Sequence, residues 1–367
     1  MSSQQTFSFS RLLQPLVAPD VFDFWASKIS PTLAWNRALA KVVERHVEAK
    51  DTVTLVLKCN RHFKGYEPGQ HLNVMVEVDG VRLTRSYSPT SLPGKGRRLA
   101  ITVKRVEGGK VSTQLCTRTQ VGDVIELGDS FGEMTLANST CDKWLFVAAG
   151  SGITPLISLT RALAAQGRAK DVVLLYWART RADVCFATEL KELAKQQVGF
   201  RAQVFLTRET SLLEGELSGR PSGEQIEQLV PDLAERTVYA CGPAGFVTTI
   251  RNALQAKAGQ FKEEAFSLPE PEETNLLADA AGETVQVQLA LSGRTLTVPV
   301  GQPLLNALEE QGIQPAYGCR MGICKTCVCS KTGGTTRDLM TGYTEPEPDQ
   351  ALRLCISSAV TDVTLDL

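Results

Sequence analysis

The stretch Trp144-Leu-Phe-Val-Ala-Ala-Gly150-Ser-Gly152-Ile-Thr154-Pro155 joins a short apolar run to a glycine turn and a proline. Six apolar residues without a charge predict a buried strand, and the two glycines let the next backbone segment approach a neighbour or a ligand closely. Proline is favoured in the first turn of a helix, so Pro155 indicates that a helix begins there. The stretch therefore predicts a strand, a tight turn and a helix, which is the repeating unit of an α/β domain.

Similar apolar runs follow this unit along the chain, at residues 171–177, 201–206 and 237–240. Helical patterns at residues 155–166 and 187–196 separate the first of them. Buried strands that alternate with helices form parallel sheets covered on both faces. This part of the chain is therefore predicted to be an α/β domain with a doubly wound parallel sheet.

The chain before this unit has a different pattern. Between residues 38 and 128, β-branched and alternating segments dominate, for example at 52–57, 72–78 and 99–104. Turn signals such as Pro68-Gly69 separate them. Short alternating strands joined by turns predict an antiparallel β-barrel.

The chain after this unit begins with an acidic, proline-containing stretch at residues 263–273, which is typical of a linker between domains. Two strand patterns, a short helical pattern and a cysteine-rich loop follow it. We expect an N-terminal extension at 1–36, a β-barrel domain at 37–138, a parallel-sheet domain at 139–266, a linker at 267–283 and an α+β domain at 284–367.

The composition of the 367-residue chain is that of a globular protein with more than one domain, with 43% hydrophobic and 22% charged residues. Lysine and arginine number 39 against 40 acidic residues, so no net field favours nucleic acid as a partner. The N-terminus lacks a secretion signal, and no segment approaches the roughly 20 apolar residues of a membrane-spanning helix. We therefore expect a cytoplasmic protein that does not bind nucleic acid.

Five of the ten cysteines lie close together near the C-terminus. The spacing Cys319-x4-Cys324-x2-Cys327, with Cys355 further on, is that of the ligands of a plant-type [2Fe–2S] cluster. A zinc site is the first alternative, but structural zinc sites usually combine two close cysteine pairs and only one is present. A group of free thiols is the second. Cys329 is not expected to be a ligand, because the spacing already supplies four.

A second motif is Arg85-Ser86-Tyr87-Ser88. Arginine can neutralise a phosphate, an aromatic ring can pack along a flavin, and a hydroxyl can hydrogen-bond its polar edge. The motif resembles the R-x-Y-S flavin motif of the ferredoxin–NADP reductase superfamily, in which a turn and strand like those ending at His71 precede it. A strand with one buried tyrosine is the structural alternative.

The segment Gly109-Lys110-Val111-Ser112 follows this motif and is predicted to begin a helix, whose free N–H groups could bind a phosphate. A glycine–serine turn at this distance from the motif resembles the FAD-binding branch of the superfamily. The FMN-binding branch orders its segment differently. The resemblance therefore implies FAD, with FMN as the alternative.

The same superfamily binds its nicotinamide nucleotide on a glycine loop like the one containing Gly150, Gly152, Thr154 and Pro155. It has a second contact at a segment like Cys241-Gly242-Pro243, and the resemblance implies that this cysteine lies near the site of hydride transfer. Ser88 at the flavin and Cys241 at the nicotinamide are therefore the expected catalytic residues.

Three arginines follow the predicted strands of this domain, and arginine suits the 2′-phosphate that distinguishes NADPH from NADH. They are Arg179, Arg181 and Arg208. NADPH is therefore expected in preference to NADH. The alternative is that these arginines are ordinary surface residues.

The resemblance extends over the chain beyond about residue 37, with a C-terminal domain similar to a plant-type ferredoxin of β-grasp fold. It implies an oxidoreductase that passes electrons from NADPH through FAD and a [2Fe–2S] cluster to a partner protein. In related reductases an aromatic residue near the end of the nicotinamide domain covers the flavin, and Phe266 stands at the corresponding place here. No acid or base residue is required by this chemistry.

Chains with this domain order resemble the reductase components of bacterial oxygenases, hydroxylases and fatty acyl desaturases. The N-terminal extension, with its aromatic stretch at residues 21–35, most resembles the branch that serves desaturases, which implies a membrane di-iron fatty acyl desaturase as the acceptor. An aromatic segment of this kind could also make peripheral contact with the inner membrane. A soluble oxygenase is the alternative acceptor, and a helix packed on the flavin domain is the alternative role of the segment. A redox sensor without turnover and a zinc-binding interaction module are hypotheses of other classes.

The near-neutral net charge conceals an asymmetry between the two ends of the chain. Residues 1–261 carry 32 lysines and arginines against 25 acidic residues, whereas residues 262–367 carry 7 against 15. Opposite charges on tethered domains favour their association. We therefore expect electrostatic docking of the ferredoxin-like domain within the chain.

Overall fold

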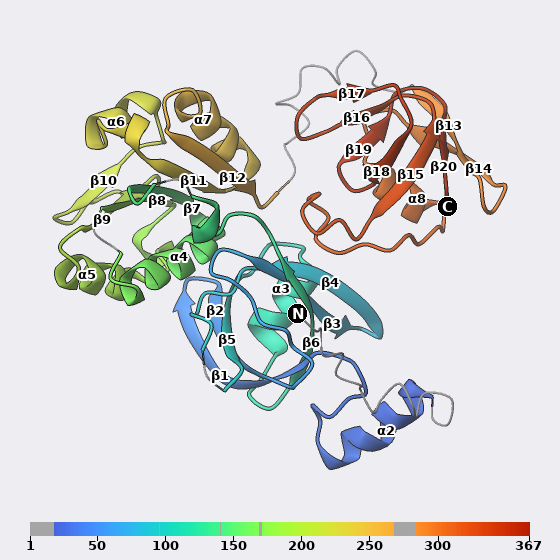
Figure 1. Cartoon of the computed structure of the whole chain (residues 1–367), viewed down its shortest axis with the longest axis horizontal. Helices are drawn as coiled ribbons and strands as arrows, with labels where there is room; N and C mark the ends of the chain where they lie inside the picture. The colour runs from blue at the N-terminus through green and yellow to red at the C-terminus, as the bar shows by residue number, and fades with distance from the viewer. Residues whose placement is uncertain (1–17, 95, 140, 169–170, 268–282) are drawn as a thin grey trace, which may run out of the picture.

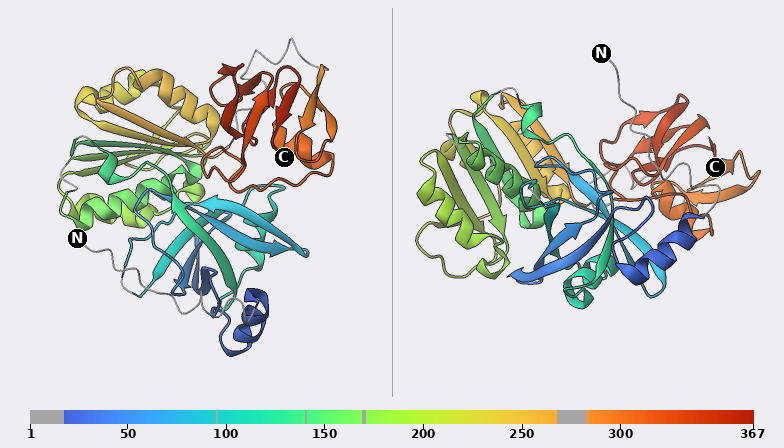
Figure 2. Two further views of the ribbon diagram at one scale, coloured as in Figure 1. Left: turned by 45° about the vertical axis from the view of Figure 1, so that its right-hand side comes forward. Right: turned by 60° about the horizontal axis from the view of Figure 1, so that its bottom comes forward.

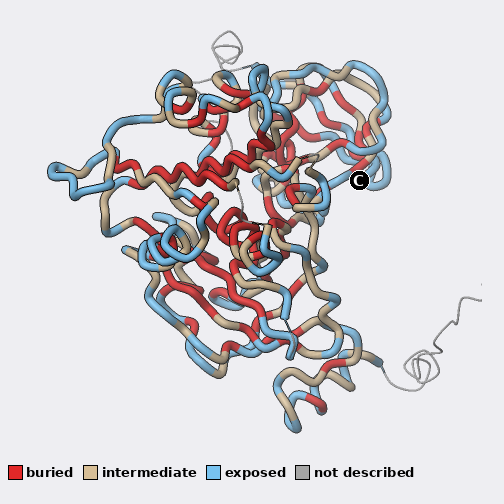
Figure 3. The backbone as a smooth tube through the Cα atoms, turned by 60° about the vertical axis from the view of Figure 1, so that its left-hand side comes forward, coloured by how far each residue is buried: buried red, intermediate tan, exposed pale blue. Residues whose placement is uncertain are grey.

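The computed structural model describes residues 18–94, 96–139, 141–168, 171–267 and 283–367. These residues form three domains, each built on a β-sheet of its own, and a helix that projects beside the first domain (Figures 1 and 2). Buried residues are concentrated in the interior of the domains (Figure 3). The predicted fold classes, an antiparallel barrel, a doubly wound parallel sheet and an α+β domain, are confirmed.

The first domain is an antiparallel sheet with the strand order β4-β3-β6-β1-β2-β5. A bridge between Pro89, just after β4, and Ile101 of β5 joins the two edge strands and closes the barrel. A short helix, α3 (Lys110–Thr113), begins after the glycine turn, as predicted. It continues into a π-helical turn at Gln114–Arg118. The strands are β1 (Leu39–Ala49), β2 (Thr52–Cys59), β3 (His71–Val78), β4 (Val81–Tyr87), β5 (Arg98–Lys104) and β6 (Val124–Phe131).

The second domain is a parallel sheet in the order β10-β9-β8-β7-β11-β12, with helices on both faces. Neighbouring residues of β7 point to opposite faces, so Phe146 packs in the core under α4 and α5 and Val147 in the core under α6 and α7. The strands are β7 (Trp144–Ala149), β8 (Val172–Ala178), β9 (Phe200–Leu206), β10 (Glu216–Ser218), β11 (Thr237–Gly242) and β12 (Gln260–Ala265). The helices are α4 (Ile153–Ala165), α5 (Ala187–Gln196), α6 (Gly223–Leu229) and α7 (Ala244–Leu254).

The third domain has a five-stranded sheet in the order β14-β13-β20-β15-β18 and a small sheet in the order β17-β16-β19. Parallel pairing of β13 with the last strand, β20, joins the two ends of the domain. The only described helix here, α8 (Leu304–Glu310), buries Leu304, Leu305 and Leu308 in the core. The strands are β13 (Thr284–Leu289), β14 (Thr295–Pro299), β15 (Val328–Gly333), β16 (Thr336–Asp338), β17 (Thr344–Glu345), β18 (Asp349–Arg353), β19 (Ser357–Ala359) and β20 (Val363–Leu365).

The acidic stretch at residues 263–273, typical of a linker, begins within the last strand of the parallel sheet, before the predicted linker at 267–283. The predicted domain boundaries stay predictions. Glu263 and Glu264 belong to β12, which pairs with β11 over its whole length. Their carboxylates are bonded to Arg251 and His71, so acidic character does not exclude them from a strand. Residues 268–282 of the predicted linker lie outside the described residues.

The N-terminal extension contains one described helix, α2 (Pro19–Ile29), which ends before Pro31. The ring of Phe22 packs against Trp35 with centroids 5.1 Å apart, and the Trp35 N–H donates to Asp23 at 2.6 Å. The other side of α2 is exposed and carries large apolar residues: Val21, Phe24, Trp25 and Ile29. None of the helices within the described ranges is long and apolar enough to cross a membrane.

Candidate cofactor and nucleotide site

Predicted site residues from each of the three domains line one cavity of about 440 Å³. Its wall includes the R-x-Y-S motif of β4, the start of α3, and the loop between β7 and α4. The chain after β12 and the cysteine loop of the third domain complete it. The predicted residues that line it are His71, Arg85, Ser86, Tyr87, Ser88, Gly109, Lys110, Val111, Ser112, Thr154, Phe266 and Cys319.

The R-x-Y-S motif occupies the end of β4 and presents a cation, an aromatic ring and hydroxyls to the cavity. Ser86 Oγ donates to Asn73 Oδ1 at 2.7 Å, which fixes the motif against β3. Burial and the nearby Arg320 guanidinium lower the pKa of Arg85. Burial raises the pKa of the Tyr87 hydroxyl, so its ring is a neutral surface at physiological pH.

The start of α3 forms the neighbouring part of the wall. A methyl group on Gly109 would lie 2.6 Å from Ser112 Oγ and 3.1 Å from the Val106 carbonyl oxygen, so the turn accepts only glycine without rearrangement. Lys110 and Arg85 both line the cavity, and neither forms an ion pair with a carboxylate among the described residues. Two cations without a carboxylate partner fit an anionic ligand such as the pyrophosphate of a dinucleotide.

Ser88, His71 and Glu264 form a chain of hydrogen bonds in the wall. The His71 ring bonds to Ser88 Oγ through Nδ1 at 2.7 Å and to Glu264 through Nε2. Ser88 and His71 line the cavity, whereas Glu264 lines a second hollow of about 320 Å³ on the other side. The chain therefore connects the two spaces through groups that can carry a proton.

The glycine loops after β7 and β11 touch each other, because the strand order reverses between these two strands. A methyl group on Gly152 would lie 2.1 Å from the Cys241 carbonyl oxygen, and one on Gly242 would lie 3.0 Å from Ala149 Cβ. Gly150 adopts a positive φ of 55°. Pro155 and Pro243 stand at the starts of α4 and α7.

Phe266 and Cys241 lie close to these loops but differ in exposure to the cavity. The Phe266 N–H donates to the Gly242 carbonyl at 2.8 Å, and its ring meets His71 edge-on at 6.0 Å. Cys241 is fully buried, with its Sγ 3.8 Å from the sulfur of Met134. Burial raises the pKa of the Cys241 thiol, and the residue lies behind the cavity wall. Its role in hydride transfer stays a prediction.

The three arginines predicted for the nucleotide are placed differently. Arg179 and Arg208 line an adjacent cavity of about 620 Å³, which shares Lys104 and Val106 with the first. The side chains of both arginines make no hydrogen bond or ion pair with other described residues. Arg181 instead bonds to Glu216 at 2.7 Å and does not line this cavity. The first two are therefore available to an anion and Arg181 is not.

The cysteine loop surrounds its sulfurs with backbone N–H groups. Cys324 Sγ accepts from the Cys319 N–H at 3.2 Å, and Cys355 Sγ accepts from the Gly322 N–H at 3.2 Å. The hydrogen bond with the neighbouring Cys319 thiol, together with bonds from the Cys319 N–H and from Thr326, lowers the pKa of Cys324 to about 5. The sulfurs lie in two contacting pairs, Cys319 with Cys324 and Cys327 with Cys355, and these pairs with their amide donors fit the thiolate ligands of a [2Fe–2S] cluster. Cys327 contacts Cys355, and Cys329 is buried in the domain core.

The cysteine loop rests on the barrel beside the R-x-Y-S motif. A methyl group on Gly318 would lie 2.8 Å from Cys324 Sγ and 3.2 Å from Asn73 Nδ2. No ion pair joins residues 283–367 to the remaining described residues, so internal electrostatic docking stays a prediction. The cationic Arg320, bonded to Glu309, faces the cavity near Arg85.

Several wall residues were not predicted from the sequence. Glu264 falls within the predicted parallel-sheet domain but was not expected at the site, and Ser151, Lys104 and Arg320 were not among the expected site residues. Ser151 could have been found, because it stands between the two predicted glycines. The others come together only through the packing of the domains.

Family models match each domain of the chain. The oxidoreductase FAD-binding domain matches residues 39–135, the oxidoreductase NAD-binding domain 146–252, and the 2Fe-2S iron-sulfur cluster binding domain 287–360. An NADPH oxidoreductase of Mycobacterium tuberculosis is 34% identical over 98% of this chain and 90% of its own. The chain belongs to the ferredoxin–NADP reductase superfamily.

Further similarities of this reductase extend over most of its length. A glycine betaine monooxygenase reductase subunit of Chromohalobacter salexigens is 28% identical over 82% of the chain and 87% of its own. The structure of phthalate dioxygenase reductase, which is 23% identical, superposes with a TM-score of 0.61 over 90% of the chain and 97% of its own. The protein is an NAD(P)H-dependent oxidoreductase that transfers electrons through FAD and a [2Fe–2S] cluster.

Proposed function

We propose that this reductase delivers electrons from NADPH to the oxygenase component of a monooxygenase or dioxygenase system. The observation that carries the proposal is the cavity of about 440 Å³ in which the flavin motif, the nucleotide loop and the cysteine loop form one wall. Relatives named as oxygenase reductase subunits support this class of acceptor.

In this proposal the protein residues divide the binding of the cofactors among the three domains. Arg85 and Lys110 neutralise the FAD pyrophosphate, and Tyr87 packs along the flavin. The four cysteines 319, 324, 327 and 355 hold the cluster, and Phe266 shields the flavin face until the nucleotide enters. When bound, FAD supplies a hydride acceptor and the cluster supplies one-electron transfer.

The Ser88–His71–Glu264 chain manages the proton that accompanies flavin chemistry. The Ser88 hydroxyl faces the cavity, and the His71 ring can accept its proton at Nδ1 while Nε2 donates to Glu264. Glu264 opens toward the hollow of about 320 Å³ on the other side. Ser88 thus exchanges a proton with solvent without opening the cavity. The chain gives Ser88 the predicted catalytic role.

Arg179 and Arg208 give the reductase its preference for NADPH. Both line the cavity of about 620 Å³ that adjoins the first one, and neither has a carboxylate partner among the residues described. A 2′-phosphate would gain charge-assisted hydrogen bonds from them that a 2′-hydroxyl cannot match. Arg181, bonded to Glu216, has a structural role in this proposal.

The test of the proposed function is a reconstitution with purified acceptors. Holoprotein, NADPH and an oxygenase component from the same cells should give hydroxylated product with matching NADPH consumption. The Cys324→Ser protein should support no product. Reduction of an acyl desaturase, with no reduction of any oxygenase from the cell, would contradict the proposal.

A membrane-bound fatty acyl desaturase is the second candidate acceptor, and helix α2 favours it. Phe24 and Trp25 of α2 are more than half exposed, at 57% and 66%, and their rings contact each other edge-on, with Lys28 of the same helix over the Phe24 ring. An apolar aromatic helix face of this kind can lie in a lipid headgroup region. The reductase would then work at the membrane surface without crossing it.

The α2 face can be tested with acyl desaturase in lipid vesicles. Replacing Phe24 and Trp25 by serine should lower desaturation while cytochrome c reduction is unchanged. Val198→Ser, which removes a fully exposed apolar side chain on a different domain, is the matched control. Equal desaturation by all three proteins would remove this candidate.

A further inference from the structure

A hydrogen bond from the buried Tyr176 hydroxyl holds the loop after β7 on the side of the domain core. Tyr176 of β8 is fully buried, and its hydroxyl donates to the Gly150 carbonyl oxygen at 3.1 Å. In a trans peptide the C=O and the next N–H point in opposite directions. Because the Gly150 carbonyl is held toward the core, the Ser151 N–H points away from it, on the side of the cavity that Ser151 lines.

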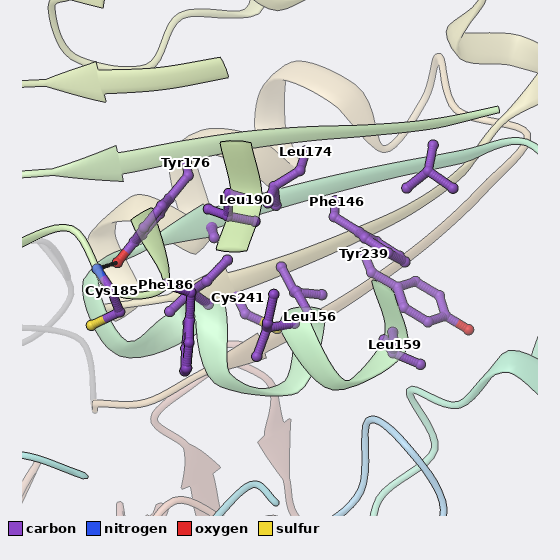
Figure 4. Close-up of a cluster of buried hydrophobic side chains, with 14 of the residues drawn as sticks. Phe146, Leu156, Leu159, Leu174, Tyr176, Cys185, Phe186, Leu190, Tyr239 and Cys241 are labelled. Carbon is purple, nitrogen blue, oxygen red and sulfur yellow. Dashed lines mark hydrogen bonds between the residues drawn. The ribbon is translucent and has the colours of Figure 1, made fainter. Parts of the chain in front are cut away.

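The same hydroxyl also holds a strained segment before α5. It accepts a hydrogen bond from the Cys185 N–H at 3.3 Å (Figure 4). The next residue, Phe186, has a φ of +57°, which is unfavourable for a bulky side chain. Its N–H donates to Glu48 of the barrel at 2.8 Å. One hydroxyl therefore links the nucleotide loop to a segment that the flavin domain holds in place.

We propose that Tyr176 is a positioning residue for the nicotinamide dinucleotide. Its hydroxyl turns the Gly150–Ser151 peptide so that the Ser151 N–H meets the pyrophosphate, without touching the nucleotide itself. Through Cys185 and Phe186, the docking of the flavin domain supports the same geometry. The inference rests on the proposed placement of the dinucleotide on the loop from Gly150 to Pro155.

The first test measures the Kd of NADP⁺ for the holoprotein by calorimetry. Tyr176→Phe keeps the buried ring and removes only the hydroxyl, so the Kd should rise about tenfold. The KM for NADPH should rise by the same factor, and kcat at saturating NADPH should stay within about twofold. A loss confined to kcat, with the Kd unchanged, would overturn the proposal.

The matched control is Tyr239→Phe. Tyr239 is equally buried, and its hydroxyl donates to the Thr135 carbonyl at 2.8 Å, at the opposite end of the same core (Figure 4). Both variants should lose thermal stability, but Tyr239→Phe should keep the wild-type Kd. If Tyr176→Phe and Tyr239→Phe have the same Kd for NADP⁺, Tyr176 has only a structural role, which would contradict the proposal.

Two further variants separate this inference from the proposed binding site. Gly152→Ala places a methyl group 2.1 Å from the Cys241 carbonyl and should abolish NADP⁺ binding. Unchanged binding by Gly152→Ala would refute the placement of the nucleotide and with it the proposal. If Tyr176→Phe does not fold, Glu48→Ala decides: a rise of about two- to threefold in Kd supports the proposal, and an unchanged Kd overturns it.

Discussion

The cysteine loop and the cavity beside it are built in opposite ways. The loop takes three of its four sulfur ligands from the short segment between Cys319 and Cys327, and its N–H donors come from the same segment. The cavity takes its wall from all three domains, between His71 and Ile323 in the sequence. A local site depends on its own segment, whereas a site between domains depends on how the domains pack. A substitution in the loop should therefore affect the cluster alone, whereas a substitution in the cavity wall should affect more than one bound group.

Removing one cysteine expected to hold the cluster gives the largest expected effect, and this effect should be confined to the cluster. Cys324→Ser should abolish the visible absorption of the cluster and all reduction of protein acceptors, because four thiolates are needed. Reduction of FAD by NADPH, followed by stopped-flow absorbance, should stay within about twofold. Cys329→Ser, which changes a buried cysteine of the same domain, should keep the cluster. A loss of FAD reduction in Cys324→Ser would show that the sites are not independent.

Arg85→Ala tests the cavity at the flavin phosphate. Its loss removes charge-assisted hydrogen bonds, so the affinity for FAD should fall about 10- to 100-fold and FAD should be lost on gel filtration. Arg82→Ala, on the same strand but paired with Glu126 at the surface, should retain FAD. Full FAD occupancy in the Arg85 variant would mean that another residue holds the phosphate.

Arg208→Asp tests the adjacent cavity. The KM for NADPH should rise about 10- to 100-fold, while that for NADH changes little, because only NADPH carries the 2′-phosphate. Arg181→Gln should lower stability and leave the ratio of the two KM values unchanged, since Glu216 already engages this arginine. If Arg181→Gln shifts the preference and Arg208→Asp does not, the assignment is reversed.

Glu264→Gln should have the smallest effect, which tests whether the hydrogen-bonded chain acts in catalysis. Reoxidation of reduced FAD should slow by on the order of tenfold and its solvent isotope effect should change, because the amide cannot accept a proton from His71. NADP⁺ and FAD affinities should not move. Unchanged kinetics would assign the chain a purely structural role.

The sequence predicted the parts of this protein that are encoded locally. The strand, glycine turn and helix at residues 144–155 follow from apolar periodicity and from the conformational needs of glycine and proline, and the structure confirms them. The expected cluster ligands follow from spacing alone, and their role as ligands stays a prediction. The R-x-Y-S motif was found because four consecutive residues carry it, the last three of β4 and the residue that follows.

What the sequence could not predict depends on contacts between distant segments. Glu264 lies in an acidic stretch typical of linkers, and only its bond to His71, 193 residues earlier in the chain, makes it part of the site. Arg181 and Arg208 both follow a strand of the parallel sheet, so the sequence does not distinguish them. In the structure Arg181 forms an ion pair with Glu216, whereas Arg208 lines the adjacent cavity. The contacts of the Tyr176 hydroxyl could not be predicted for the same reason, because its partners lie on two other segments.

The central claim is that the cavity joins nucleotide, flavin and cluster within one chain. Stopped-flow reduction of the holoprotein by NADPH tests it most directly, with FAD and cluster followed at separate wavelengths. Cluster reduction should follow FAD reduction with a first-order rate that does not change over a tenfold range of protein concentration. A rate proportional to protein concentration would mean that electrons pass between molecules, and would contradict the claim.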